Sequence, residues 1–318
     1  MILITGADGF IGQYVCKDLL AHRYEIVRIG RTVGMKNWMN TGRVHQAAFD
    51  ISNSKSFGIL PLRNVEAVIH CAAALMIDGL SAKVYFEVNA VGTFNVLEYC
   101  REAGAKMIFL MTHSDTNAID ELYLDESSER IFKTSSYKDG ENSVPFIASK
   151  IAAAEMIRSY ARDGVVNATI LRIANVRGYG SKDTKYNSVF HQFIAKARNS
   201  EPIELWGALK TQRDLIYVKD VARAVRLAMV KAPSGLYNIG SGKGMTIEDE
   251  AREIVKVFSP LDNPSKFVYR KEIPEVRKHS CIFRIDKARQ HFGWAPIYSY
   301  HDGLVDMKHE QEGSYACK

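Results

Sequence analysis

Three glycines near the start of the chain form a pattern that can bind an anion. They are Gly6, Gly9 and Gly12, and they follow the short apolar run 1–4. Glycine can adopt left-handed backbone angles and lets a phosphate or a second backbone segment come close. A helix that begins near Phe10 would direct its first amides and its dipole at this loop, as phosphate-binding helices do.

This pattern favours a bound dinucleotide over a turn that binds nothing. Ile11, Val15 and Leu19 lie on one face of the helix that would follow the glycines. A strand, a glycine loop and an amphipathic helix therefore come in the order that dinucleotide-binding folds use. The spacing is Gly-x-x-Gly-x-x-Gly, whereas the common fingerprint is Gly-x-Gly-x-x-Gly. The alternative is a tight strand-to-helix turn without a ligand.

The end of the second predicted strand, 25–29, bears on which dinucleotide could bind. Chains that bind NAD usually place a carboxylate about 20 residues beyond the glycines, where it binds the ribose 2′-hydroxyl. No carboxylate ends this strand, and Arg31 stands there instead. An arginine beside the ribose would favour a 2′-phosphate, so we predict NADP as the cofactor and keep NAD as the alternative. A solvated surface arginine is the other interpretation.

Thr112, Phe146 and Lys150 stand at the ends of predicted elements. Thr112 ends a predicted strand over 106–111, so it would emerge at the carboxyl end of the sheet, where open α/β sheets bind ligands. A helix is predicted over 146–161. Phe146 and Lys150 are four residues apart and therefore share a face at the start of that helix.

Strands and helices alternate throughout the first half of the chain. The predicted strands cover 1–4, 25–29, 44–49, 65–71, 106–111 and 168–173, and the last is expected to complete the sheet. With right-handed crossovers, this alternation predicts an α/β fold with a doubly wound parallel sheet of the Rossmann type. Its ligand crevice would lie at the carboxyl ends of the strands.

Beyond Asn175 the character of the chain changes to glycines, charged residues and short segments. Helices are predicted around 187–198, over 218–229 and over 247–258. We predict a Rossmann domain over 1–174 with returns around 213–240. A smaller α/β substrate-binding domain would occupy mainly 175–318.

The composition is that of an ordinary globular protein. The chain has 318 residues, 47% hydrophobic and 25% charged, and a net charge of +6 with Lys and Arg scattered along it. We therefore expect no nucleic-acid partner, and the lack of a long apolar run predicts no membrane association. The five cysteines form no Cys-x-x-Cys pair and the nine histidines show no ligand spacing, so we expect a reducing cytoplasm and no metal site.

We expect one histidine and two tryptophan residues to have structural roles. His70 is expected to pack at the end of its strand and not to bind a metal, and Trp206 and Trp294 are expected in the core.

Eight short motifs occur in order along nearly the whole chain. They are Thr5-Gly-Ala-Asp-Gly-Phe-Ile-Gly12, His70-Cys-Ala-Ala-Ala74, Val88-Asn-Ala-Val-Gly-Thr-Phe-Asn-Val96, Ser149-Lys150, Arg172-Ile-Ala-Asn-Val176 with Gly178, Gln212-Arg-Asp-Leu-Ile-Tyr-Val-Lys-Asp220, Asn238-Ile-Gly-Ser-Gly242 and Gly293-Trp-Ala-Pro296. With them the chain resembles the extended short-chain dehydrogenase/reductases of the NAD-dependent epimerase/dehydratase type, which act on nucleotide sugars.

The resemblance implies hydride transfer at a carbon of a nucleotide-diphosphate sugar. In this scheme Thr112 would hydrogen-bond the reacting oxygen, and Lys150 would bind the nicotinamide ribose and lower the pKa of a catalytic tyrosine from about 10. The implied cofactor-binding residues are Gly6, Asp8, Gly9, Phe10, Ile11, Gly12, Arg31, Asp50, Ile51, Ala72, Ala73, Asn89 and Lys150. The implied substrate-binding residues are Asn175, Arg177, Arg213 and Arg277.

Phe146 departs from this scheme, because the family's tyrosine belongs four residues before the lysine. A phenyl ring cannot donate or accept a proton, and loss of such a group typically costs roughly 10²- to 10⁴-fold in rate. Three explanations stay open. The phenylalanine is a deliberate replacement that keeps a substrate unreacted, or another donor such as Tyr137, His113 or Ser114 is used, or the protein binds cofactor and ligand without turnover.

Arg177 is a second departure, since the family usually has tyrosine there. A cation at this position could meet a ligand phosphate, and an exposed arginine without a ligand is the alternative.

The residues after Thr112 bear on the reaction. The family's 4,6-dehydratases follow the threonine with Asp-Glu, whereas this chain has His113 and Ser114. The activities that remain are those of a 4-epimerase and a keto-sugar reductase. A different class of function is that of a regulator which binds the dinucleotide without catalysis. By resemblance, a homodimer formed through helices at 84–101 and 146–161 is also expected.

Overall fold

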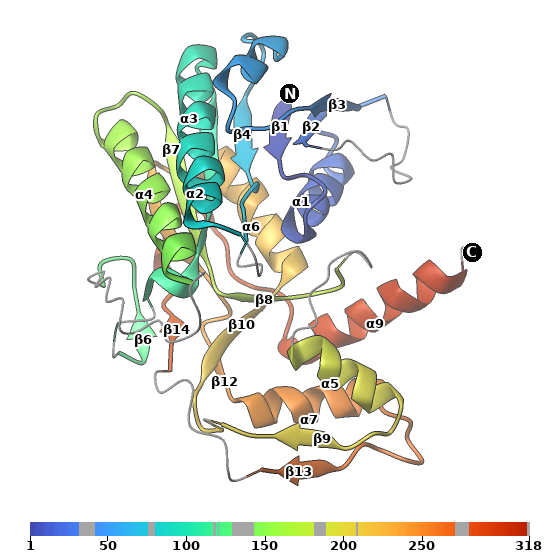
Figure 1. The fold of residues 1–318 in the computed structure, drawn as a ribbon. Coiled ribbons are helices and arrows are strands. Elements are labelled where there is room, and N and C mark those ends of the chain that lie inside the picture. The colour runs from blue at the N-terminus through green and yellow to red at the C-terminus, as the bar shows by residue number, and fades with distance from the viewer. Residues whose placement is uncertain are drawn as a thin grey trace.

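The structure is a computed structural model that describes residues 1–31, 42–75, 80–116, 119, 121–128, 143–180, 189–207, 209–270 and 280–316. Its centre is a seven-stranded sheet of order β11-β7-β5-β4-β1-β2-β3, in which every neighbouring pair is parallel (Figure 1). The strands are β1 (Ile2–Thr5), β2 (Ile26–Gly30), β3 (Val44–Ala48), β4 (Ala67–His70), β5 (Lys106–Thr112), β7 (Ala168–Ile173) and β11 (Gly235–Ile239). This arrangement confirms the predicted doubly wound α/β sheet.

Helices cover both faces of this sheet (Figure 1). Ile2 and Ile4 pack in one apolar cluster with α1 (Phe10–Ala21) and α6 (Val218–Lys231), whereas Leu3, between them, packs in a second cluster with α3 (Gly92–Ala103) and α4 (Ser143–Arg162). Alternate residues of a strand point to opposite faces, so both faces of a parallel sheet need apolar side chains. The continuous apolar runs of the sequence meet this requirement.

Strand order reverses beside β1. From β1 the chain moves outward to β2 and β3, then returns to the other side of β1 to form β4, β5 and β7. The crevice between β1 and β4 is therefore the topological switch point, where open α/β sheets bind their ligands. The glycine loop leaves β1 at this point.

The second half of the chain adds to this sheet and also builds a smaller part below it (Figure 1). The smaller part includes α5 (Val189–Arg198), α7 (Ile247–Phe258) and α9 (Tyr300–Ala316). Short strands accompany these helices, namely β8 (Asn175–Arg177), β9 (Ile203–Leu205), β10 (Arg213–Tyr217), β12 (Gly244–Met245) and β13 (Phe267–Tyr269). The remaining elements are β6 (Tyr123–Leu124), which pairs with β14 (Ile282–Phe283), and α8 (Asp286–Phe292).

Two details differ from the sequence-based predictions. The strand over 168–173 does not complete the sheet, because β11 pairs with it as a seventh strand. The helix expected at 84–101 is divided into α2 (Ala82–Tyr85), a π-helical turn η2 (Phe86–Val91) and α3. The structure also has two 3₁₀ turns, η1 (Ser54–Ile59) after β3 and η3 (His113–Thr116) after β5.

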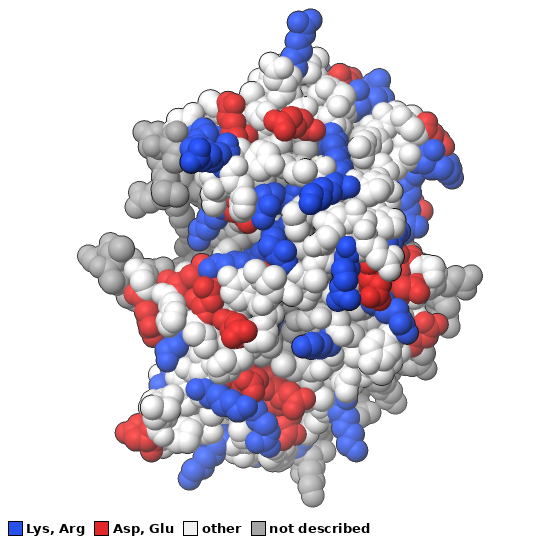
Figure 2. All heavy atoms as spheres, turned by 180° about the vertical axis from the view of Figure 1, so that it is seen from behind, with Lys and Arg blue, Asp and Glu red and all other residues white. Residues whose placement is uncertain are grey.

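The surface carries charges of both signs. On the face seen in Figure 2, Lys and Arg side chains lie among Asp and Glu side chains. Among the described residues, no helix is both long and apolar enough to cross a membrane.

Candidate active site

The glycine loop is packed so closely that side chains are excluded from it. Gly6 has a φ of +66°, and a Cβ there would lie 2.6 Å from the amide nitrogen of Ala72. A Cβ on Gly12 would lie 2.1 Å from the carbonyl oxygen of Gly6. The loop therefore rests directly on the backbone after β4 on one side and on the start of α1 on the other.

The start of α1 fits a phosphate group. Gly9 is the N-cap residue, so no side chain caps the helix, and its first turn contains no acidic residue. The first amides of a helix have no partner within the helix, and the helix dipole favours an anion beside them. Phe10 and Ile11 are half-buried at this end. The loop residues thus have the geometry expected for a dinucleotide pyrophosphate, and their assignment to the cofactor stays a prediction.

Two charged residues lie next to this loop. Asp8 forms an ion pair with Arg28, a buried arginine in the middle of β2. Arg31, at the end of β2, is exposed. The sequence reasoning missed Arg28, although one charged residue inside the apolar run of a buried strand is a signal that could have found it.

His70 is the centre of a chain of hydrogen bonds under the loop. The Thr93 hydroxyl donates to the carbonyl oxygen of Asn89 at 2.6 Å, so the Nε2–H of His70 must donate to Thr93 at 2.9 Å. Nδ1 of His70 then accepts from the Thr5 hydroxyl at 2.6 Å, and the Thr5 oxygen accepts from the amide of Ala72 at 3.3 Å. Burial, followed by the charge of Lys150, lowers the pKa of His70 to about 3, so the ring is neutral.

Asn89 extends this chain to the predicted catalytic helix. Its side chain accepts from the amide of Ala74 at 2.8 Å and donates to the Ala74 carbonyl oxygen at 3.1 Å. It also donates to the hydroxyl of Ser149 at 3.0 Å, and Ser149 donates to the carbonyl oxygen of Phe146 at 2.7 Å. Asn89 therefore fixes the loop after β4 against the start of α4, and its predicted contact with the cofactor stays a prediction.

Lys150 lies buried at the carboxyl end of β5. Its Nζ donates to the carbonyl oxygen of Leu110 at 2.9 Å and lies 4.1 Å from the ring centroid of Phe109. Burial lowers the pKa of Lys150 to about 7. The amine can therefore exchange a proton near neutral pH.

Thr112 lies two residues beyond this carbonyl group, at the end of β5. Its hydroxyl donates to Oγ of Ser114 at 3.1 Å and accepts from the amide of Ser114 at 3.2 Å. His113 is half-buried beside them. Two of the three alternative donors thus adjoin Thr112, whereas Tyr137 lies outside the described residues.

Phe146 is buried against Tyr85. The two rings meet edge to face at 6.0 Å between centroids, and Ile147 completes this small cluster. The structure therefore places an apolar ring one helical turn before Lys150. Tyr85, which the sequence reasoning did not consider, is fully buried beside it.

The remaining predicted cofactor residues surround the ends of β3 and β4. Asp50 accepts from the amide of Ser52 at 2.9 Å and from its hydroxyl at 2.8 Å. Ile51 is buried, and Ala72 and Ala73 are half-buried after β4. All four lie at the carboxyl edge of the sheet, and their contacts with a cofactor stay predictions.

Arg177 is engaged within the protein. Its Nε donates to Glu250 of α7 at 2.6 Å and its Nη2 to the same carboxylate at 3.3 Å, while Tyr300 donates to Glu250 at 3.0 Å. Burial lowers the pKa of Arg177, but the attraction of Glu250 raises it more, so it stays above its usual value. A ligand phosphate would have to compete with this ion pair. The sequence carried no signal for Glu250.

The other predicted substrate residues lie near β10. Asn175 donates to the carbonyl oxygen of Asp214 at 3.1 Å, and Arg213 begins β10. Arg277 lies outside the described residues. Asp214, which was not singled out, is buried and accepts four hydrogen bonds, two from Ser241 and one each from the amides of Gly242 and Phe283. It therefore holds the 238–242 motif against β10.

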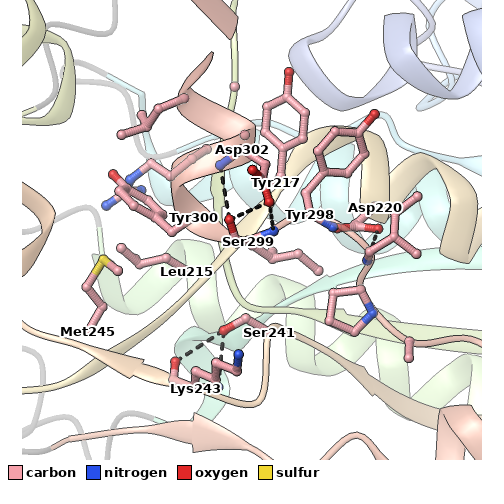
Figure 3. Close-up of a pocket in the computed structure, with 18 of the residues that line it drawn as sticks. Leu215, Tyr217, Asp220, Ser241, Lys243, Met245, Tyr298, Ser299, Tyr300 and Asp302 are labelled. Atoms are coloured by element: carbon pink, nitrogen blue, oxygen red, sulfur yellow. Dashed lines mark hydrogen bonds between the residues drawn. The ribbon is translucent and has the colours of Figure 1, made fainter. Parts of the chain in front are cut away.

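A cavity of about 590 Å³ lies apart from the predicted catalytic residues (Figure 3). It is lined by residues of β10 and β12 and by the start of α9, with Ser241 and Lys243 below Tyr217 and Ser299 in this view. Arg177 lines it, but Thr112, Phe146 and Lys150 do not. We assign it no role in the chemistry of those three residues.

Three other expectations can be compared with the structure. Trp294 is fully buried as predicted, but Trp206 is exposed, so the prediction for Trp206 was wrong. Among the described residues, no group of three or more His, Cys, Asp or Glu side chains is arranged to hold a metal ion.

A family profile and a similar protein both relate this chain to epimerases. A profile described as the NAD dependent epimerase/dehydratase family matches residues 2–240. One relative, from Methanocaldococcus jannaschii and provisionally named a UDP-glucose 4-epimerase, is 28% identical over 308 residues, which is 96% of each chain.

Two solved structures share the fold. UDP-glucose 4-epimerase from Thermotoga maritima, solved with UDP-glucose, has a TM-score of 0.81 at 24% identity and covers 99% of both chains. dTDP-glucose 4,6-dehydratase from Streptomyces venezuelae, solved with NAD, has a TM-score of 0.78 at 22% identity and covers 99% of this chain and 98% of that one.

The close packing of the glycine loop predicts the effect of Gly12→Ala. The new Cβ would collide with the backbone oxygen of Gly6, which cannot rotate away. We expect the free energy of unfolding to fall by more than about 2 kcal/mol and dinucleotide binding to be lost. Gly58→Ala is the control, because no atom lies within 4 Å of its new Cβ, and it should change stability by less than about 0.5 kcal/mol. Equal effects in urea denaturation would contradict this account of the loop.

The neutral state of His70 predicts a pH dependence of stability. Its pKa is about 3 in the folded protein and near 6.5 when unfolded, so the unfolded chain binds the extra proton between these values. Stability should therefore fall as pH falls below about 6.5, by about 1.4 kcal/mol per pH unit from this residue. Between pH 7 and pH 5.5, His70→Gln should lose about 1 kcal/mol less unfolding free energy than the wild type. Parallel losses in the two proteins would show that His70 does not titrate in this way.

Proposed function

The chain belongs to the NAD dependent epimerase/dehydratase family, and we propose that it transfers hydride between a nicotinamide cofactor and a nucleotide-diphosphate sugar, as a 4-epimerase does. The single observation that best supports this is the placement of Lys150. Its buried ammonium is bonded to Leu110, two residues before Thr112, at the edge of the sheet where the uncapped start of α1 also lies. A phosphate site and a hydroxyl–amine pair thus share the ligand-binding edge of the sheet.

The chain's own residues would hold the two reactants. When bound, the cofactor supplies the hydride acceptor and donor. The amides at the start of α1 would bind its phosphates, and Lys150 would donate to its nicotinamide ribose. Thr112 would donate a hydrogen bond to the sugar oxygen whose carbon reacts, where charge develops.

The proton of that sugar oxygen needs a carrier other than Phe146. Ser114 is hydrogen-bonded to Thr112, and Lys150 has a pKa of about 7, so both can take part in a transfer at neutral pH. Tyr137 and His113 remain the other candidates. Without a phenol at position 146, we expect this transfer to limit the rate.

The position of Asp115 supports an epimerase over a dehydratase. It is the first carboxylate after Thr112, and it is fully buried 3.7 Å from Arg172. Water elimination requires an acid and a base that reach the sugar. A keto-sugar reductase would use the same residues as an epimerase, and the relative from Methanocaldococcus jannaschii favours the epimerase.

A protein that binds cofactor and nucleotide sugar without turnover is the second candidate. Phe146, buried against Tyr85 and Ile147, favours it, because a phenylalanine supplies no acid or base at the position one helical turn before Lys150. Such a protein would be stabilised by the cofactor and would leave every sugar nucleotide unchanged.

Restoring the phenol separates these candidates. For Phe146→Tyr we expect hydride transfer with UDP-glucose and NAD or NADP to rise by roughly 10²- to 10⁴-fold, because Lys150 can then activate a tyrosine. The measurement is chromatography of the sugar nucleotides after incubation, together with cofactor absorbance. Phe267→Tyr is the control, since it adds a phenol to a half-buried position on β13.

The outcomes differ clearly. A slow wild type that Phe146→Tyr accelerates supports the enzyme. Cofactor binding with no conversion by either protein, across UDP and dTDP sugars, supports the binding protein. If neither cofactor binds, the proposed function is wrong.

A homodimer through α3 and α4 is part of this proposal. Exposed apolar side chains before and on α3 support it, namely Phe86 and Val91 on η2 and Phe94 on α3. We expect light scattering to give twice the chain mass for the wild type and a shift toward the monomer for Phe94→Glu. Leu261→Glu, which alters an exposed leucine elsewhere, should leave the mass unchanged. A monomeric wild type would refute the dimer.

A further inference from the structure

We propose that Asp8 is the carboxylate that binds the hydroxyls of the adenosine ribose, so that this chain binds NAD in preference to NADP. The inference rests on the proposed function only in that a dinucleotide binds at the glycine loop. It runs against the prediction from Arg31.

The ribose site needs a carboxylate that β2 does not supply. In dinucleotide-binding sheets of this kind, an acidic residue at the end of the second strand accepts a hydrogen bond from the ribose 2′-hydroxyl. Here β2 ends in Gly30 and is followed by Arg31. The conventional position therefore holds no acceptor side chain.

The backbone brings Asp8 to the same end of β2. In the register of the two strands, Thr5 lies beside Ile29, and the amide of Gly6 donates to the carbonyl oxygen of Ile29 at 2.9 Å. The glycine loop is thus joined to the carboxyl end of β2 at its first residue. Asp8 follows two residues later, so its carboxylate lies in the loop that passes this strand end.

Arg28 fixes the position of that carboxylate. It shares the α1 face of β2 with Ile26, and its side chain is 2% exposed, whereas that of Asp8 is 43% exposed. A buried guanidinium needs a carboxylate partner, and leaving it unpaired would be strongly destabilising. Nη2 of Arg28 donates a hydrogen bond to Oδ1 of Asp8. Within the described part of the chain, nothing bonds Oδ2, which remains for a ligand on the exposed side.

Charge then decides between the two dinucleotides. The 2′-phosphate of NADP would place a second anion beside Asp8, and like charges brought together cost binding energy. The charge of Arg28 is already matched by Asp8. Arg31 is exposed, and an ion pair between exposed groups contributes little in water and salt. A ribose with two free hydroxyls meets no such cost and gains a charged acceptor.

Binding constants for NAD and NADP test this without any turnover. Calorimetric titration of the wild type, with no sugar nucleotide present, should show NAD binding at least 10-fold more tightly than NADP. Asp8→Asn should weaken NAD, strengthen NADP and bring this ratio near one. Arg31→Ala is the control, and its ratio should stay within threefold of the wild type.

A second variant covers the case in which Asp8→Asn unfolds the protein because Arg28 loses its contact with a carboxylate. The double variant Asp8→Asn with Arg28→Met removes both members of the pair, and its ratio should also approach one. Tighter binding of NADP by the wild type, or a ratio that follows Arg31 and not Asp8, overturns the inference and leaves the proposed function standing. If neither dinucleotide binds, the inference and the proposed function both fail.

Discussion

The direct contact of the glycine loop with the backbone after β4 is the constraint on which the rest of the site depends. Gly6 touches Ala72 with no room for a side chain, and Gly12 touches Gly6 in turn. This contact brings the open end of α1 to the switch point of the sheet, beside the ends of β4 and β5. A looser loop would move the amides of α1 away from Thr112 and Lys150, and the proposed phosphate site and the proposed reactive groups would no longer meet at one ligand.

A buried network of hydrogen bonds connects the end of β1 to α3 and α4 and helps to maintain this contact. His70 joins β1 to η2 and α3, and Asn89 and Ser149 continue the connection to the backbone of Phe146. Each donor in this series has an acceptor, which a buried network requires. The π-helical turn carries Asn89 to the place where it meets both Ala74 and Ser149. Segments far apart in the sequence are therefore held in one fixed geometry at the carboxyl edge of the sheet.

The sequence predicted the strands of the sheet better than it predicted which residues the charged side chains contact. Apolar runs such as Ile2–Thr5 identify strands because a parallel sheet is buried on both faces. β11 was missed because its run is short and lies among glycines. The ion pair of Arg177 and Glu250 joins residues 73 positions apart, and nothing in either neighbourhood encodes the other. Chains of hydrogen bonds and ion pairs depend on three-dimensional proximity, so the site's electrostatics could be read only from the fold.

Phe146 fills its place with a ring that has the outline of tyrosine, packed edge-on against Tyr85. A single oxygen atom therefore separates this arrangement from one equipped with a phenol. In the genetic code, the codons for phenylalanine and tyrosine differ only at their second base. One point mutation can thus add or remove that oxygen while the scaffold is inherited unchanged. Related proteins with and without turnover could therefore have nearly the same sequence. The codon at position 146 would be the difference that distinguishes them.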